Sequence, residues 1–396
     1  APEVDREKGY TAYTKAADVY SFGKKNSGEK IRLQVRDYKF FWRTFWSGDI
    51  GFGESFVEGE WTTTDLPRLL GFFVDHAKEL DDHRLGWPSV GRWMSALRHR
   101  FRANTRQGSK KNIFEHYDLG NNFFASFLDN RMQYSCGIFD SALDDLETAQ
   151  QNKMNRLIQK ARIKPTDHIL EIGCGWGEFA IECVRQTGCM VTGVTISQAQ
   201  HDYAIKKIAE AGLTHKIKII LEDYRDLSGD FDKIISCEML EAVGHENLGT
   251  YFQVCDRLLK REGLAVLQVI TLPDQRYRKA LKKTDWIQKH IFPGSVCPSL
   301  EALSMAMTKS SSFVIDDLEN IGPHYANILN QWRQNFKQSR EAVFKMGFND
   351  KFIRKWEYYL SYCEAGFRKR ITNDLQLVLT RPNNKSLSLP ENHYGR

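Results

Sequence analysis

Hydrophobic and polar positions change their period about a hundred residues into the chain. Residues 1–108 show helical periodicity with a hairpin expected at 49–54, and no glycine-rich turn follows a strand there. From about residue 112, strand-like runs alternate with helical ones, which is typical of an α/β protein with a parallel sheet flanked by helices. The runs are 168–173, 190–196, 216–221, 231–236, 263–272, 313–319 and 375–380. They predict one doubly wound, seven-stranded domain at 109–396 behind a smaller, mainly helical N-terminal domain at 1–108.

Two insertions in the larger domain are too long to be simple connections between strands. One spans 273–312, and the other, 325–370, is helical and rich in Trp and Tyr. In doubly wound sheets, ligands bind beyond the carboxyl ends of the strands. We therefore expect the two insertions to roof that end of the sheet.

One segment near the end of the N-terminal domain combines an apolar stripe with many basic residues. Trp93, Leu97 and Phe101 recur at helical spacing, and residues 98–111 hold six Lys or Arg and no acid. Such a helix can lie in the headgroup layer of an anionic membrane. The alternative is an ordinary amphipathic helix packed on its own domain and followed by a solvated linker.

Composition narrows the class of protein. With 41% hydrophobic and 27% charged residues, the chain is typical of a soluble globular protein. Its longest apolar stretch, 263–272, is about half of the ~20 residues that a membrane span needs, and no basic-then-apolar leader is present, so we expect a cytosolic protein. A net charge of +6 is too small to indicate nucleic acid. Eight scattered cysteines without a C-x-x-C pair predict free thiols rather than disulfides or a metal site.

The strongest local signal is a strand that ends in three alternating glycines, Gly173, Gly175 and Gly177, before a helical pattern. Such a turn lets the backbone approach a bulky ligand at the helix N-terminus, although it also occurs as an ordinary tight connection. Glu178 stands where a dinucleotide-binding motif needs its last glycine, so NAD is disfavoured. With the acid Glu171 before it, the turn resembles motif I of the class I methyltransferases that use S-adenosylmethionine.

Seven short motifs follow one another along the chain: EHYDLGNN at 115–122, MQYSC at 132–136, LETAQ at 146–150, IGCGWG at 172–177, GVTIS at 193–197, DYRD at 223–226, and 277–294 ending in IFPG. Together they resemble cyclopropane-fatty-acyl-phospholipid synthases and their mycolic-acid relatives. The resemblance covers 112–382, with a fainter likeness at 51–61. The run 237–245 and the pair Leu267 and Gln268 look nearest to the plant-type branch of that family.

The resemblance implies a Rossmann-like methyltransferase that transfers a methyl group from S-adenosylmethionine to a cis double bond of a phospholipid acyl chain. Proton loss and ring closure would then give a cyclopropane fatty acid. The implied cofactor-binding residues are Tyr134, Ser135, Glu171, Gly173, Gly175, Gly177, Thr195, Ile196, Gln200, Asp223 and Tyr224. As a lone acid after a strand, Asp223 would more often cap a helix.

The resemblance also implies a bound bicarbonate ion that takes the proton. The residues implied near it are Cys136, Glu241, Gln268, Ile270 and Tyr325. Many bacterial members of the family have His where this chain has Gln268. Glutamine can donate and accept hydrogen bonds but cannot titrate, so it cannot relay the proton to or from the base.

From the residues alone, each of these side chains has an ordinary alternative. Glu238 and Glu241 follow the fourth strand-like run, where carboxylates often cap the next helix. Cys136 fits a small buried side chain, Tyr325 a packed aromatic, and Gln268 a surface residue on an edge strand. His116 lies in an aromatic-rich segment, and we expect it to have a packing or gating role.

The implied substrate makes a membrane surface the expected partner, because the double bond of an acyl chain lies deep inside a bilayer. We therefore expect a cytoplasmic, peripherally membrane-associated protein. Members of the family are often dimers, which implies a homodimer, although no pattern in the sequence indicates an interface. Three other functions stay open: a lipid methyltransferase that leaves a methyl or methylene branch, a small-molecule amine N-methyltransferase, and a lipid-binding protein without activity.

Overall fold

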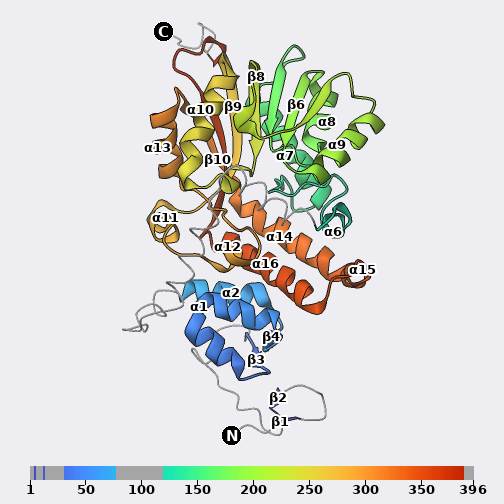
Figure 1. Ribbon diagram of the computed structural model, residues 1–396, viewed down its shortest axis with the longest axis vertical. Helices are drawn as coiled ribbons and strands as arrows, with labels where there is room; N and C mark the ends of the chain where they lie inside the picture. Colours follow the sequence, from blue (N-terminus) through green and yellow to red (C-terminus); the bar gives the residue numbers. More distant parts are fainter. Residues whose placement is uncertain (1–3, 6–11, 14–30, 77–118, 388–396) are drawn as a thin grey trace.

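The computed structural model describes residues 4–5, 12–13, 31–76 and 119–387 (Figure 1). The basic amphipathic segment, His116 and the domain boundary at residue 108 lie outside these ranges and stay predictions. None of the described helices is long and apolar enough to cross a membrane. The short strands β1 (Val4–Asp5) and β2 (Ala12–Tyr13) pair with each other near the N-terminus.

A seven-stranded sheet forms the centre of the larger part of the molecule, with the strand order β10-β11-β9-β8-β5-β6-β7. Its strands are β5 (His168–Ile172), β6 (Met190–Thr195), β7 (Ile217–Leu221), β8 (Phe231–Cys237), β9 (Leu259–Thr271), β10 (Val314–Asn320) and β11 (Asn373–Thr380). Each of the seven predicted runs is therefore a strand of this sheet, and the predicted fold class is confirmed.

The sheet is parallel, as expected, except for one strand near its edge. Strands β5 to β9 pair in parallel, but β11 runs antiparallel to both β9 and β10. The helical insertion between β10 and β11 returns the chain to the sheet from its carboxyl end, so β11 enters in the opposite direction. A residue pattern that marks buried strands does not by itself carry strand direction.

Helices cover both faces of the sheet (Figure 1). Strand residues alternate between the two faces, so Ile169 packs in a cluster with α7 (Leu146–Ala161), α8 (Glu178–Thr187) and α9 (Gln198–Glu210). Its neighbour Leu170 packs on the other side, in a cluster with α10 (Leu248–Leu258) and α13 (Leu300–Ser310). The result is a three-layer arrangement whose strand ends are left for ligands. The connections include the short helices η2 (Tyr224–Asp226), η3 (Leu240–Ala242), η4 (His245–Asn247) and η5 (Lys385–Leu387).

The second insertion forms a helical layer between the sheet and the N-terminal helices (Figure 1). Its helices are α14 (Gly322–Gln338), α15 (Arg340–Lys345) and α16 (Asp350–Arg368). The first insertion adds α11 (Asp274–Ala280) and α12 (Trp286–His290) on the same side, and α6 (Asn121–Ala125) packs against α14 through Phe123 and Phe336. An aromatic core that includes the fully buried Trp61, Trp332 and Trp356 joins this layer to the N-terminal helices.

The hairpin expected at 49–54 is wrong. Helix α1 (Lys39–Val57) includes these residues, with a kink at Gly48, and α2 (Leu66–Asp75) follows the small pair β3 (Leu33–Val35) and β4 (Trp61–Thr63). The glycines serve close packing instead of a turn. A Cβ on Gly51 would lie 2.0 Å from the Arg43 carbonyl oxygen, and one on Gly53 would lie 2.5 Å from the Trp286 ring.

Candidate active site

A cavity of about 2210 Å³ lies beyond the carboxyl ends of strands β5 to β9, under α14 and α16, and reaches α1. Most of the residues implied by the resemblance line it: Tyr134, Ser135, Glu171, Gly173, Gly175, Thr195, Ile196, Gln200, Asp223, Tyr224, Glu241, Ile270 and Tyr325. Gly177, Cys136 and Gln268 lie behind its wall. The fold thus gathers these residues from seven segments of the chain around one space.

The glycine turn at 173–177 adopts the conformations that its sequence predicts. Gly173, Gly175 and Gly177 have φ values of 83°, 52° and 85°, in the left-handed region that favours glycine. A Cβ on Gly175 would meet no atom within 4 Å, so this glycine faces open space in the cavity. A Cβ on Gly177 would lie 2.9 Å from the Ala204 side chain, so this glycine lets α8 and α9 pack closely instead.

Glu171 presents a buried carboxyl to the same end of the cavity. Burial raises its pKa to about 8, against a smaller opposing effect of the Lys153 charge. Among the described residues, its Oε2 atom has no hydrogen-bond partner. A buried carboxyl without partners is costly, and a ligand with hydroxyl or amino groups would satisfy it.

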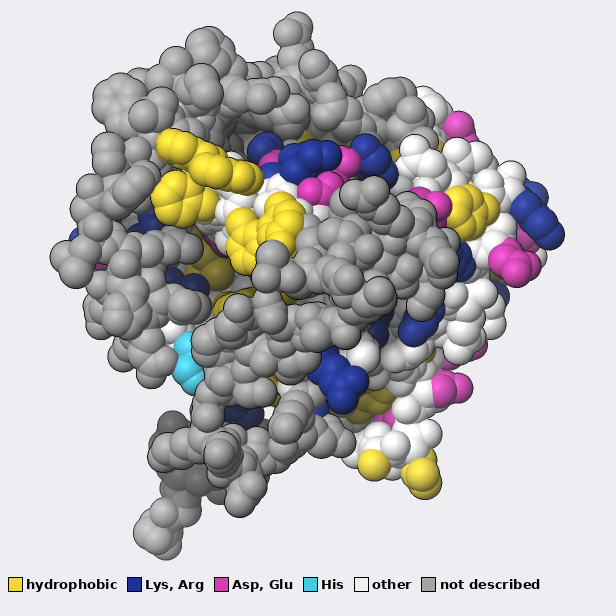
Figure 2. Space-filling view, turned by 90° about the horizontal axis from the view of Figure 1, so that it is seen from below, with side chains coloured by type: hydrophobic (Ala, Val, Ile, Leu, Met, Phe, Trp, Pro, Cys, Tyr) yellow, Lys and Arg dark blue, Asp and Glu magenta, His cyan; other side chains and the backbone are white. Residues whose placement is uncertain are grey.

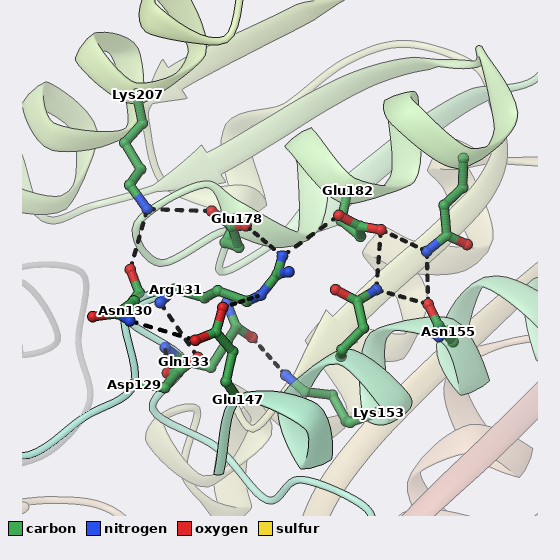
Figure 3. A network of polar contacts seen from close by, with 12 residues as sticks. Asp129, Asn130, Arg131, Gln133, Glu147, Lys153, Asn155, Glu178, Glu182 and Lys207 are labelled. Carbon is green, nitrogen blue, oxygen red and sulfur yellow. Dashed lines mark hydrogen bonds and ion pairs between the residues drawn. The ribbon is translucent and has the colours of Figure 1, made fainter. Parts of the chain in front are cut away.

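A polar network holds the segment that carries Ser135 beside the glycine turn (Figure 3). The buried Lys153 of α7 donates from Nζ to Gln133 Oε1 at 2.6 Å and to Ser135 Oγ at 3.0 Å. Arg131 donates from one guanidinium nitrogen to Glu178 Oε1, in the first turn of α8, at 2.9 Å. The position of this loop is therefore fixed by α7 and α8 rather than by its own sequence.

The remaining cofactor-side residues have partners inside the protein. Thr195 donates from Oγ1 to Gln200 Oε1 at 2.9 Å. Asp223 accepts from the side chain of Arg225 at 2.9 and 2.6 Å and from its backbone N–H, so it caps η2, in keeping with the ordinary alternative. It also lines the cavity, and its role toward an adenine amino group stays a prediction.

At the other end of the cavity, the carboxylate of Glu238 lies among the residues expected to hold bicarbonate. The backbone N–H of Cys136 and Nε2 of Gln268 donate to Glu238 Oε1, at 2.7 and 2.8 Å. The hydroxyl of Tyr325 donates to Glu238 Oε2 at 2.7 Å. We call these four residues the Glu238 cluster.

Glu241 lies next to the Glu238 cluster. Its Oε1 accepts the backbone N–H of Ile270, while Oε2 has no partner among the described residues. Burial, followed by the charge of Glu238, raises the pKa of Glu241 to about 8. The helix-cap alternative is wrong for both carboxyls, because the N-cap residue of η3 is Met239 and no side chain caps this helix.

The alternative that Gln268 is a surface residue on an edge strand is wrong. Strand β9 lies between β8 and β11, and Gln268 is 1% exposed. Its Nε2 also donates to Asp374 Oδ2 at 3.1 Å, and its Oε1 accepts from Gln376 at 3.1 Å. Burial and the neighbouring Glu238, to which it is hydrogen-bonded, raise the pKa of Asp374 well above its usual range.

Sequence reasoning missed two members of this group, Glu238 and Asp374. In the sequence, Glu238 was visible as one of two carboxylates three residues apart after a strand. Gln268 was visible as a residue that cannot titrate. Asp374 was visible only as an acid at the start of an apolar strand. None of these signals could indicate contact, because Cys136, Glu238, Gln268 and Asp374 come from separate segments of the chain.

Comparison with known proteins places the chain in a family. It matches the family model of mycolic acid cyclopropane synthetases over residues 104–377. It is 38% identical to a tuberculostearic acid methyltransferase, UfaA1, of Mycobacterium tuberculosis, over 84% of this chain and 79% of that one. It is 35% identical to the cyclopropane-fatty-acyl-phospholipid synthase of Escherichia coli K12, over 90% of this chain and 89% of that one.

Solved structures agree with this placement. The cyclopropane synthase MmaA2 from Mycobacterium tuberculosis superposes with a TM-score of 0.64 at 26% identity, covering 69% of this chain and 98% of that one. Coclaurine N-methyltransferase has a TM-score of 0.65 at 14% identity, covering 84% of this chain and 99% of that one, and so shares the fold. The chain belongs to the cyclopropane synthetase family of S-adenosylmethionine-dependent methyltransferases.

Proposed function

We propose that the protein transfers a methyl group from S-adenosylmethionine to the cis double bond of an unsaturated phospholipid acyl chain and forms a cyclopropane ring. The observation that carries this proposal is the continuity of the cavity, which runs from the glycine turn past an aromatic wall to exposed aromatic residues on α1. The family and the Escherichia coli relative support the same chemistry.

The cofactor end of the cavity fits S-adenosylmethionine. Gly175 leaves open space beside the turn, and the Oε2 atom of Glu171 lacks a partner that ribose hydroxyls or an amino group would supply. Glu171, Gly173 and Gly175 would hold the ribose and methionine side, with Thr195 and Asp223 beyond them. The bound sulfonium supplies an electrophilic methyl group. The protein then has to position an alkene in line with it, which contributes on the order of 7 to 11 kcal/mol in well-oriented reactions.

The acyl end of the cavity is suited to a hydrocarbon that gains positive charge. Aromatic side chains from α14 and α16 and the loop after α12 line it, including Tyr325, Tyr358, Tyr359 and Phe292. Such a wall excludes water, which would otherwise capture a carbocation. Aromatic faces also stabilise a desolvated cation by up to about 2 kcal/mol.

The bicarbonate implied by the resemblance does not fit this structure. The Cys136 N–H, the Gln268 amide and the Tyr325 hydroxyl already donate to the carboxylate of Glu238. An added anion would compete with that carboxylate for the same donors and would be repelled by its charge. We therefore leave bicarbonate out of the proposed reaction.

The test of the proposed function is an incubation of the purified protein with methyl-labelled S-adenosylmethionine and vesicles of a mono-unsaturated phospholipid. We expect the label in the acyl chain, a mass gain of one CH₂ with loss of the alkene, and a ring-proton signal at unusually high field. Label that appears only in an added amine, or in no product, would contradict the proposal.

A second candidate is a lipid methyltransferase that leaves a methyl or methylene branch. The name of the 38% identical tuberculostearic acid methyltransferase favours it. Both candidates share methyl transfer to the alkene. A methylene branch then needs a 1,2-hydride shift before the added methyl group loses its proton, and a methyl-branched alkene needs loss of a proton from a chain carbon instead. The same incubation separates them, because a methylene branch keeps an alkene signal and a cyclopropane does not.

A stripe of exposed aromatic residues on α1 supports a membrane surface as the partner. Tyr38, Phe41, Trp42, Phe45 and Trp46 recur at helical spacing and are each between 50% and 63% exposed. Phe45 and Trp46 also line the cavity, so the stripe leads into it. Large exposed apolar patches mark interaction sites, and Trp and Tyr favour the interface between lipid and water.

Basic residues border the same opening. Those that line the cavity from α11 to α12 are Arg276, Lys279, Lys282, Lys283 and Lys289, against the single acid Asp285 from that segment. Figure 2 views the molecule from the end of the N-terminal helices and shows exposed hydrophobic side chains beside Lys and Arg. An aromatic stripe next to basic side chains complements an anionic bilayer rather than a neutral protein surface.

Replacing Trp42 and Trp46 by Ser tests this partner. We expect vesicle affinity to fall about 30-fold, taking about 1 kcal/mol for each ring at the interface. Sedimentation with anionic vesicles measures it, and added salt should weaken binding by the wild-type protein. Phe344→Ser, at an exposed aromatic on α15, is the matched control. Unchanged vesicle binding together with a lower oligomeric mass would instead assign the stripe to a second copy of the chain.

A further inference from the structure

The Glu238 carboxylate has the shape and charge of the ion that it replaces. A bicarbonate ion, like a carboxylate, shares one negative charge between two oxygens on one carbon, and it carries a hydroxyl group in addition. All three donors of the Glu238 cluster point at those two oxygens, at 2.7 to 2.8 Å, which is typical of strong charge-assisted hydrogen bonds. The anion-binding place near Cys136 and Tyr325 is therefore filled by a side chain of the protein itself.

The backbone of Glu238 is held in a strained conformation that aims this side chain at the cavity. Its φ value is 50°, in the left-handed region that non-glycine residues seldom adopt. The backbone N–H of Glu238 donates to the Gln268 carbonyl oxygen at 2.7 Å, which ties this conformation to β9. The side chain lines the cavity together with Glu241, Ile270 and Tyr325. Strain of this kind clusters at active sites, where the surrounding structure imposes it.

Two buried carboxyls, Glu241 and Asp374, lie beside Glu238. Burial raises the pKa of Glu241 to about 8 and that of Asp374 well above its usual range. Both groups therefore favour the protonated form more than an exposed carboxyl does. Gln268 fits the same arrangement, because its amide orients the carboxylate without competing for a proton.

We propose that Glu238 is the general base of the reaction, in place of an external anion. This inference rests on the proposed function. The π electrons of the alkene form a bond to the transferred methyl carbon, the carbon–sulfur bond breaks with its electron pair left on sulfur, and the second alkene carbon becomes a cation. Glu238 then takes a proton from the added methyl group, and the C–H electron pair closes the ring onto the cation. The products are a neutral cyclopropane, S-adenosylhomocysteine and a protonated Glu238.

Dependence on bicarbonate gives the first test and needs no variant. The wild-type enzyme is assayed with labelled S-adenosylmethionine and mono-unsaturated phospholipid vesicles, in buffer purged of carbon dioxide and again with added bicarbonate. We expect equal rates of ring formation. A rate that rises about tenfold or more with bicarbonate would overturn the role of Glu238, because the base would then come from solution.

Substitution of Glu238 gives the second test. In Glu238→Gln the side chain keeps its size and loses its basicity, so we expect ring formation to fall on the order of 100- to 10,000-fold, the range of general base catalysis. Calorimetry should show unchanged binding of S-adenosylmethionine, and Glu238→Asp should retain more activity than Glu238→Gln. Glu246→Gln, at an exposed glutamate in the next turn of the chain, is the matched control with wild-type rates.

Failure of this inference differs from failure of the proposed function. Wild-type rates in Glu238→Gln, or bicarbonate-dependent rates in the wild type, would overturn the base and leave the methyl transfer standing. A wild-type protein that binds S-adenosylmethionine and labels no lipid in either buffer would overturn the proposed function and the base together.

Discussion

The two ends of the cavity are built in different ways. At the cofactor end, a strand, an acid, a glycine turn and a helix follow one another without interruption from β5 into α8. The Glu238 cluster instead combines Cys136, Glu238, Gln268 and Tyr325, each from a different element. One end is therefore made by local sequence and the other by the packing of distant segments.

This difference affects how a substitution acts. A change at Gly175 alters a backbone conformation that the residues of the turn define and meets no packed neighbour, so it should act on cofactor binding. A change in the Glu238 cluster removes one of several contacts to a shared carboxylate, so its effects should be coupled to those of its neighbours. Three predictions test this contrast.

Of these three, the largest effect is expected at Gly175. In Gly175→Ala, a methyl group enters open cavity space at a φ of 52°, so we expect affinity for S-adenosylmethionine to fall on the order of 100-fold, about 3 kcal/mol. Gly188→Ala is the matched control, since Gly188 has a φ of 73°, open space around its Cβ and a place outside the cavity lining. Calorimetry measures the affinity. Equal losses in the two variants would show that backbone strain alone is responsible.

An intermediate effect is expected at Tyr325. In Tyr325→Phe, Glu238 Oε2 loses its donor, and hydrogen bonds to charged groups contribute about 1.5–3 kcal/mol, so kcat should fall about tenfold or more. Binding of S-adenosylmethionine should not change. In the double variant with Glu238→Gln, the fold-loss of kcat should be much smaller than the product of the fold-losses in the two single variants. Additive losses would contradict a shared site.

The smallest effect is a pH-dependent change in stability at Glu171. Burial raises the pKa of this carboxyl from 4.5 to about 8, so the folded protein keeps a proton that the unfolded chain loses. The free energy of unfolding should therefore fall as pH rises from about 4.5 to 8. In Glu171→Gln this share of the loss is absent, so the variant should gain about 1 kcal/mol relative to wild type between pH 5 and pH 6.

Thermal unfolding without S-adenosylmethionine measures this difference, with Glu246→Gln as the control. The melting temperature of Glu171→Gln, relative to that of the wild type, should rise with pH over this window. A difference that stays constant, or that shrinks as pH rises, would contradict a protonated Glu171 in the folded state.

The glycines show two uses of one residue type that a local sequence pattern cannot distinguish. The same property, the absence of a Cβ, serves a turn at Gly175 and close packing at Gly51 and Gly53. In the sequence both read as turn signals, which produced the hairpin expected at 49–54. Only the contacts of Arg43 and Trp286 with these positions, made through the fold, distinguish the two uses.

The sequence by itself determined the seven strands, the glycine turn with its acid, and the family, because each depends on residues that are neighbours along the chain. The tertiary structure decided the direction of β11, the burial of Gln268, and the meeting of Glu238 with donors from three other segments. Those features depend on which segments pack together. A hydrogen-bond partner contributed by a distant strand leaves no periodic signal in the residues that it contacts.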